Sequence, residues 1–131
     1  MMQKTKIIPI LLSIFIFTTC EKPAFDERDK VIGNYSGILV INYLVDTTLG
    51  FAHDTYPVIL VLSKSDLDSV VSLNFNEINV SNTHLFNYSG GIFKSLQTYH
   101  PPQLVLKQDS LYFFYKEGLG PYWKECFTKK N

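Results

Sequence analysis

The sequence of 131 residues has little of the chemistry that marks enzymes and metalloproteins. Its three histidines, His53, His84 and His100, are separated by 31 and 16 residues, which fits no compact metal-binding motif. It has no Gly-x-Ser-x-Gly motif, and eight of its twelve acidic residues lie in a charged N-terminal stretch or in expected turns. We therefore expect no catalytic residue, no metal site and no cofactor.

The chain also lacks an excess of charge of either sign. Lys and Arg total 12, as do Asp and Glu, but Lys4 and Lys6 lie in an apparent leader, so the rest of the chain has a net charge of −2. A nucleic-acid-binding protein needs a basic surface to displace counterions from phosphates. This balance therefore argues against a nucleic-acid partner.

Long apolar runs are missing too. The N-terminal apolar stretch, residues 7–17, has 11 residues and is interrupted by Pro9 and Ser13, whereas a membrane-spanning helix needs about 20. A basic start followed by a short apolar core is typical of a secretory signal peptide. We predict that residues 1–19 are such a leader and are removed.

Cysteine is scarce, and the position of Cys20 is informative. The sequence has only Cys20 and Cys126, and Cys20 follows the apolar core directly, after Thr18 and Thr19. This arrangement resembles a bacterial lipobox, in which the cysteine thiol is acylated and becomes the first mature residue. We therefore predict a lipid on Cys20, residues 20–30 as lipidated N-terminus and tether, and membrane attachment in the cell envelope. The alternative is an ordinary secretory signal with an incidental cysteine.

Residues 31–131 have the pattern of an all-β domain. Runs rich in branched and aromatic residues alternate with turn clusters, and no stretch has a sustained helical period. Eight or nine strands are expected in an antiparallel up-and-down meander, at 35–45, 56–63, 69–75, 77–80, 84–88, 92–96, 103–107, 111–116 and 122–128. Closing such a meander into a barrel removes its edges, and a β-sandwich is the alternative.

Two segments resemble a known group of proteins. "DERDKVIGNYSG" (26–37) and "DSLYFFYKEGLGPYWKECFTKK" (109–130) are similar to the opening and the closing hairpin of small Bacteroidetes-type lipoproteins with lipocalin-like (calycin) β-barrels. The resemblance implies a lipocalin-like barrel and an outer-membrane location, on the periplasmic or the surface face. It also implies that Tyr35 fills one end of the barrel against a cation of the last strand, such as Lys124 or Lys129. The alternative is a simple edge tyrosine, since aromatic residues are common in strands.

We expect the activity to be binding. The segment "DTTLGFAHDT" (46–55) reads as a loop with an apolar tip, so Leu49 and Phe51 are predicted to close over a small apolar ligand. Phe75, Phe113 and Tyr115, which alternate along their strands, complete the candidate lining. The alternative is a protein-interaction or structural module of the envelope that uses outer apolar strand faces, as "LYFFY" (111–115) indicates.

Overall fold

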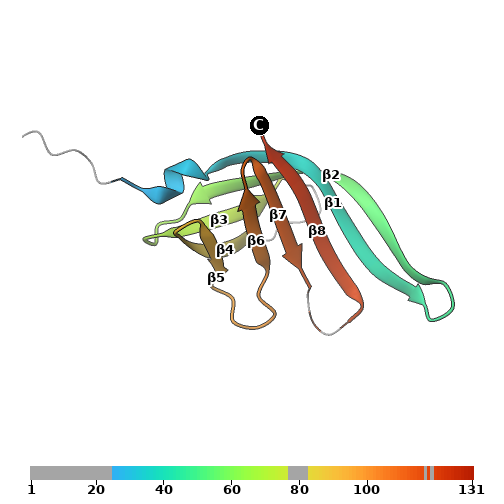
Figure 1. Cartoon of the computed structure of the whole chain (residues 1–131). Helices are drawn as coiled ribbons and strands as arrows, with labels where there is room; N and C mark the ends of the chain where they lie inside the picture. Colours follow the sequence, from blue (N-terminus) through green and yellow to red (C-terminus); the bar gives the residue numbers. More distant parts are fainter. Residues whose placement is uncertain (1–24, 77–82, 117, 119) are drawn as a thin grey trace, which may run out of the picture.

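The computed structural model describes residues 25–76, 83–116, 118 and 120–131 (Figure 1). A short 3-10 helix, η1 (Glu27–Lys30), precedes eight strands. The strands are β1 (Gly33–Asp46), β2 (Gly50–Lys64), β3 (Val70–Phe75), β4 (Thr83–Ser89), β5 (Ile92–Ser95), β6 (Gln103–Lys107), β7 (Ser110–Tyr115) and β8 (Tyr122–Lys130).

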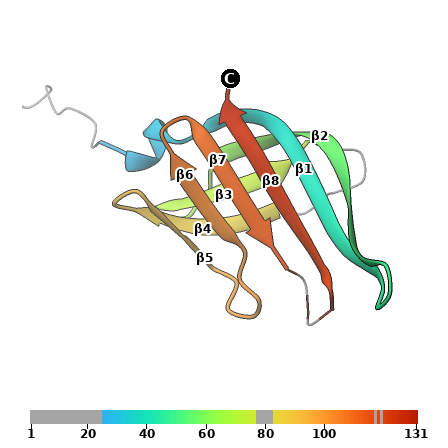
Figure 2. The same cartoon turned by 45° about the vertical axis from the view of Figure 1, so that its right-hand side comes forward.

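All eight strands belong to one antiparallel sheet, which curls into a nearly closed barrel (Figures 1 and 2). Their order is β5-β4-β3-β2-β1-β8-β7-β6, so all sequential strands pair with each other except β5 and β6, and β1 also pairs with β8. This arrangement is consistent with a calycin-like fold. The predicted all-β meander is confirmed, and the sheet is a barrel rather than the alternative sandwich.

The strands lie close to where the sequence places them, with one exception in the first hairpin. The predicted strand at 77–80 lies outside the described residues. The loop expected at 46–55 is wrong, because β1 and β2 continue through it and only residues 47–49 form the turn. The side chain of Asp46 ends β1 by accepting hydrogen bonds from the backbone N–H groups of Thr48 and Leu49. Residues 50–55 then extend against β1, with Thr55 opposite Val40 and Phe51 opposite Leu44.

Side chains that alternate along each strand fill the barrel interior. In β1, for example, Tyr35 and Leu39 are fully buried, while Ser36 and Ile38 between them point outward. The largest fully buried side chains are Tyr35, Phe86, Phe113, Leu39, Leu60, Leu62, Leu73, Leu111, Val31, Val71 and Cys126. The core is therefore built from every strand of the sheet except β5: the edge strand β6 contributes Leu104, while Phe93 of β5 and Leu106 of β6 are partly buried against the core.

Tyr35 is buried as expected, but its cationic neighbour is a different lysine. The Tyr35 hydroxyl donates a hydrogen bond to the backbone oxygen of Val31 at 2.6 Å, and the Lys130 Nζ lies 5.9 Å from the ring centroid. Lys124 and Lys129 were the wrong candidates. Lys130 is paired directly with Tyr35 in the β1–β8 register, whereas Lys124 pairs with Ile41, six residues further along β1, and Lys129 faces outward.

The N-terminal helix is fixed to the β2–β3 hairpin by one arginine. The Arg28 Nη1 donates to the backbone oxygens of Ser65, Leu67 and Val70 at 3.0–3.1 Å. Asp26 caps η1 through the Arg28 N–H and pairs with the Arg28 guanidinium at 2.8 Å, which holds the pKa of the Asp26 carboxyl well below its usual range. The structure describes residues 25–30 of the predicted tether, and within this segment Asp26 and Arg28 connect the helix to the barrel.

Candidate ligand-binding site

A groove separates the two edges of the sheet, β5 and β6. It has a volume of about 610 Å³ and runs along both strands and the segment that joins them. Its lining residues are Gly91, Ile92, Phe93, Lys94, Ser95, Gln97, Thr98, Pro101, Pro102, Gln103, Leu104, Val105 and Leu106. We call it the seam groove, because it lies where a fully closed barrel would have its last pair of strands.

The seam groove exists because β5 and β6 approach each other without pairing. Some of their Cα atoms come within 8 Å, yet the sheet ends at both strands. Each strand belongs to a tight hairpin, with Gly90 and Gly91 between β4 and β5 at φ 57° and 83°. These are the positive φ angles that a two-residue hairpin turn requires.

The backbone along the groove offers hydrogen-bonding groups. In an antiparallel hairpin, residues that flank a two-residue turn are hydrogen-bonded to each other, and alternate residues point their N–H and C=O groups away from the partner strand. Leu96 N donating to Leu85 O at 3.0 Å agrees with this alternation in the β4–β5 hairpin. By the same alternation, Phe93 on β5 and Leu104 and Leu106 on β6 direct their backbone groups toward the seam.

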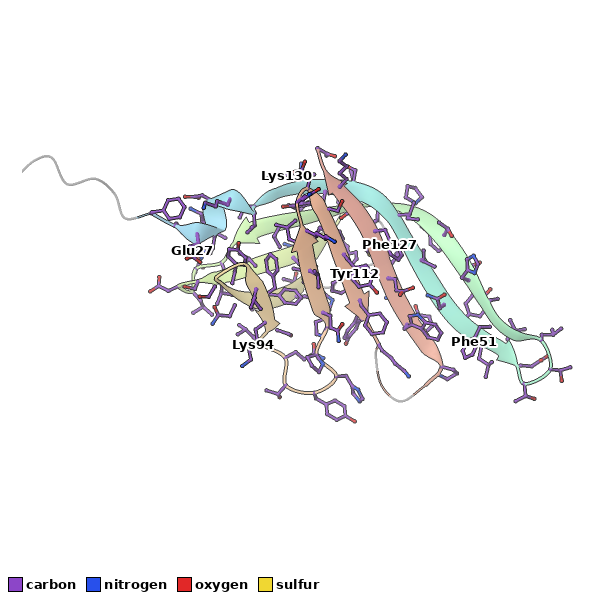
Figure 3. All side chains as sticks on the ribbon, viewed as in Figure 1. Glu27, Phe51, Lys94, Tyr112, Phe127 and Lys130 are labelled. Carbon is purple, nitrogen blue, oxygen red and sulfur yellow. The ribbon has the colours of Figure 1, made fainter. Side chains whose placement is uncertain are left out.

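The lining is mostly apolar and carries a single charge. Phe93, Leu104 and Leu106 form its inner wall, and Pro102 is buried at its end. Lys94 is the one charged side chain among the 13 lining residues, none of which is acidic (Figure 3). Such a surface suits an apolar molecule that carries a few polar or anionic groups.

The connection between β5 and β6 shapes one end of the groove. The Gln97 side chain donates from Nε2 to the backbone oxygens of Tyr99 at 2.6 Å and His100 at 3.2 Å. The rings of Tyr99 and His100 pack against each other with centroids 4.1 Å apart, and Pro101 and Pro102 follow. This segment is therefore a stiff wall rather than a loose loop.

Three of the five predicted ligand-binding residues meet inside the barrel. Phe75, Phe113 and Tyr115 surround His84, whose ring centroid lies 6.2, 5.1 and 5.0 Å from theirs. Burial, followed by the nearby Lys124, lowers the pKa of His84. This group forms a continuous aromatic part of the core, and none of its members lines the seam groove.

The other two predicted residues lie elsewhere. Leu49 and Phe51 are at the end of the long β1–β2 hairpin, 73% and 62% exposed (Figure 3). The Phe51 ring packs on Trp123 of β8, with centroids 5.3 Å apart, on the outer face of the sheet. The structure therefore does not bring the five candidates into one site.

The sequence predicted the two strands that line the seam groove, but it did not predict that they lie next to each other in space. Residues 92–96 and 103–107 were expected as strands. No local signal in the sequence indicated that these two short strands are the two free edges of the sheet, so no site was predicted between them. The only local turn signals in that region are two dipeptides, Gly90-Gly91 and Pro101-Pro102.

The remaining predictions concern the lipid anchor, membrane-spanning helices and metal sites. Cys20 lies outside the described residues. Among the residues that the structure describes, no helix has the length and apolar character needed to cross a bilayer. Within the same residues, no group of three or more His, Cys, Asp and Glu side chains is placed to hold a metal ion.

Comparison with known proteins adds no relative. No protein-family model matches the chain, and searches of curated proteins and of solved structures return no match.

Proposed function

We propose that this protein is a lipid-anchored cell-envelope lipoprotein of the small Bacteroidetes-type group and that it binds a small apolar ligand in the seam groove. The observation that carries the binding proposal is the open groove of about 610 Å³ between two unpaired strand edges, with apolar walls and one lysine. The proposal assigns no catalytic reaction to the chain. It assigns attachment to the membrane through Cys20, most simply at the outer membrane.

The groove supports binding better than the barrel interior does. The interior is filled by large side chains that are fully buried, such as Tyr35, Phe86 and Phe113. A ligand there would have to displace packed core residues, which costs several kcal/mol. In the seam groove a ligand would instead cover lining side chains that are exposed or half-buried, such as Ile92, Phe93 and Val105.

The proposal is tested with the mature full chain and the fluorescent probe 8-anilinonaphthalene-1-sulfonate, which combines an apolar ring system with one anionic group. We expect the probe to bind, Phe93→Ala to weaken binding by about tenfold, and Lys94→Gln to weaken it severalfold. Leu85→Ala is the matched control, because Leu85 is a partly exposed residue on the outer face of neighbouring β4, outside the groove lining.

Native mass spectrometry of the protein purified from its own envelope provides the second measurement. A co-purified apolar molecule that is lost in Phe93→Ala but kept in Leu85→Ala supports the groove. Equal probe binding by all variants, with no co-purified molecule, would contradict it.

The second candidate function, an envelope protein-interaction module, has its own supporting observation. The outer face of the sheet exposes Ile38, Val105 and Phe127, which are 45%, 53% and 47% exposed. These residues belong to strands β1, β6 and β8, so the exposed apolar surface is spread across the sheet rather than confined to one strand.

A further inference from the structure

A continuous row of apolar side chains crosses the outside of the barrel. Direct cross-strand pairs connect it from strand to strand, and paired residues point to the same face of a sheet. The row consists of Val105, Tyr112, Phe127, Ile38 and Pro57, on β6, β7, β8, β1 and β2. The rings of Tyr112 and Phe127 are 5.2 Å apart at its centre (Figure 3). We call this set the outer row.

The two flanks of the outer row differ in size and in charge. On β7, β8 and β1, one flank holds Phe114, Glu125 and Val40, and the other holds Ser110, Lys129 and Ser36. The first flank is bulky and acidic, and the second is small and basic. A hollow of about 330 Å³ lies on the small flank, beside Phe127.

The acidic side chain is held in place on this face. The Tyr112 hydroxyl donates to the Glu125 Oε1 at 3.0 Å, and the Asn42 Nδ2 donates to the Oε2 at 3.3 Å. Burial, together with Glu125, raises the pKa of Tyr112 to about 12, so its hydroxyl stays protonated as a donor at physiological pH. The carboxylate therefore has a defined position beside the outer row.

The difference between the flanks makes this face complementary to itself. A two-fold axis that runs along the outer row would place each row residue opposite its own copy and would exchange the flanks. Glu125 would face the other copy's Lys129, Phe114 would face Ser110, and Val40 would face Ser36. Each pair then combines opposite charges, or a large side chain with the hollow on the small flank. An axis along the strands would instead set Glu125 against Glu125 and Lys129 against Lys129.

We propose that the outer face of β7, β8 and β1 is the interface of a two-fold homodimer whose axis runs along the outer row. Strand spacings of about 4.8 Å, with about 6.6 Å between successive outward residues, give a footprint of roughly 400 Å² per copy. A standard interface buries about 800 Å² per partner, so the dimer is weak in dilute solution. Attachment of both copies to one bilayer would raise their effective concentration and favour it. This surface is centred on β8, so the proposal does not depend on a ligand in the seam groove.

The dimer is tested by cross-linking the full-length chain in its own membranes with a short bis-maleimide. Facing sheets pack about 10 Å apart, which is beyond disulfide range but within reach of such a reagent. Phe127→Cys lies on the axis and is expected to give a cross-linked dimer of one chain type. Leu85→Cys, on the outer face of β4, is the matched control, and the unmodified chain gives the background from its own cysteines.

The orientation of the axis is tested by mixing two variants. Glu125→Cys and Lys129→Cys chains with different tags are expected to cross-link to each other several times more than either does to itself, because only the mixed pair is opposed. Lys129→Glu is expected to lower the cross-linked fraction of Phe127→Cys by about tenfold, since it replaces two symmetric ion pairs with repulsion. Adding Glu125→Lys to Lys129→Glu should restore it.

Several outcomes would overturn the proposal. One is a Phe127→Cys yield no higher than that of Leu85→Cys while maleimide labelling shows the introduced thiol to be accessible. Equal self and mixed cross-linking of the Glu125→Cys and Lys129→Cys chains would rule out this axis. A product with the mass of a different protein would show that the face binds another partner.

Discussion

Tyr35 shows how much a single residue can be predicted from its type and position. A tyrosine on the first strand of a meander is expected to be buried, and its hydroxyl then needs a partner. The structure supplies the Val31 oxygen at 2.6 Å, and burial raises the pKa of the phenol. The identity of its lysine was not predictable, because it depends on the register between β1 and β8, which are separated by most of the chain.

His84 is a residue whose surroundings depend on several strands. It is 9% exposed and lies among Phe75, Phe113 and Tyr115. Alternation along their strands placed Phe75, Phe113 and Tyr115 in the candidate lining. It could not show that three strands bring them around one imidazole, because that follows from the curvature of the sheet.

This burial makes stability depend on pH. The pKa of His84 lies below its ordinary value of 6.5 in the folded protein, because burial and Lys124 disfavour the charged imidazole. Above pH 6.5 the imidazole is neutral in both states, so it imposes no penalty. As the pH falls below 6.5, the unfolded chain takes up a proton before the folded protein does, and the free energy of unfolding decreases. The decrease from this residue ends once the pH is below the folded pKa.

We predict that His84→Phe reduces this acid sensitivity. Urea unfolding between about pH 5 and pH 7.5 should show a shallower fall in the free energy of unfolding for the variant, with the wild-type slope from this residue at most about 1.4 kcal/mol per pH unit. His53→Gln, at an exposed position on β2, serves as the control. Identical slopes for wild type and His84→Phe would show that His84 is not the responsible group.

At the scale of the elements, the strands were predictable because alternation and turn residues are local signals. "SVVSLNF" (69–75) alternates and becomes β3, and the Gly90-Gly91 turn separates β4 from β5. The first hairpin was mispredicted because Gly50, Ala52 and Asp54 are poor strand formers. They extend nevertheless, since a 14-residue β1 offers them a continuous partner.

The contact between β1 and β8 depends on Gly37. A Cβ at this position would lie 1.9 Å from the backbone oxygen of Phe127 and 2.7 Å from the Cα of Thr128. These are backbone atoms and cannot rotate away. Thr128 is also fixed, because its hydroxyl donates to the Leu111 oxygen at 2.9 Å and so connects β8 to β7.

We therefore predict that Gly37→Ala forces β1 and β8 apart and lowers the free energy of unfolding by about 1–3 kcal/mol or more. Ser36→Ala, the adjacent outward position on the same strand, is the control and should change it by less than about 0.5 kcal/mol. The midpoints of urea unfolding, followed by circular dichroism, measure both. A Gly37→Ala midpoint equal to that of Ser36→Ala would mean that the strands separate at no cost.

At the scale of the whole molecule, the sequence predicted a barrel but not where it would remain open. Closure depends on how far an eight-stranded sheet curls, and the two edges come from the short strands β5 and β6 in the middle of the chain. For this reason the candidate site lies at the seam and not at the tip of the first hairpin, where the sequence predicted it. The position of Arg28 against the β2–β3 hairpin could likewise not be predicted from the sequence, because Arg28 binds three backbone carbonyls that are far away along the chain.

The last prediction concerns how the whole molecule is held at the membrane. Each buried methylene of an acyl chain contributes about 0.8 kcal/mol to membrane binding, so two or more chains on Cys20 would anchor the protein durably. The 11-residue apolar stretch before it is too short to span a bilayer in its place. We predict that the N-terminal peptide of the wild-type protein carries acyl mass on Cys20, and that Cys20→Ser loses this mass and most of the stable membrane fraction.

Intact-mass analysis and membrane fractionation test this prediction, with Glu21→Gln as the neighbouring control that should retain both properties. Circular dichroism of the Cys20→Ser chain should keep its β signal, because η1 and the strands begin after the predicted anchor. An unmodified Cys20 in the wild-type protein would show that the chain uses an ordinary secretory signal. In that case the effective concentration that favours the proposed weak dimer would be lost, whereas the proposed binding in the seam groove, whose lining residues in the described part of the chain all lie within 91–106, should be kept.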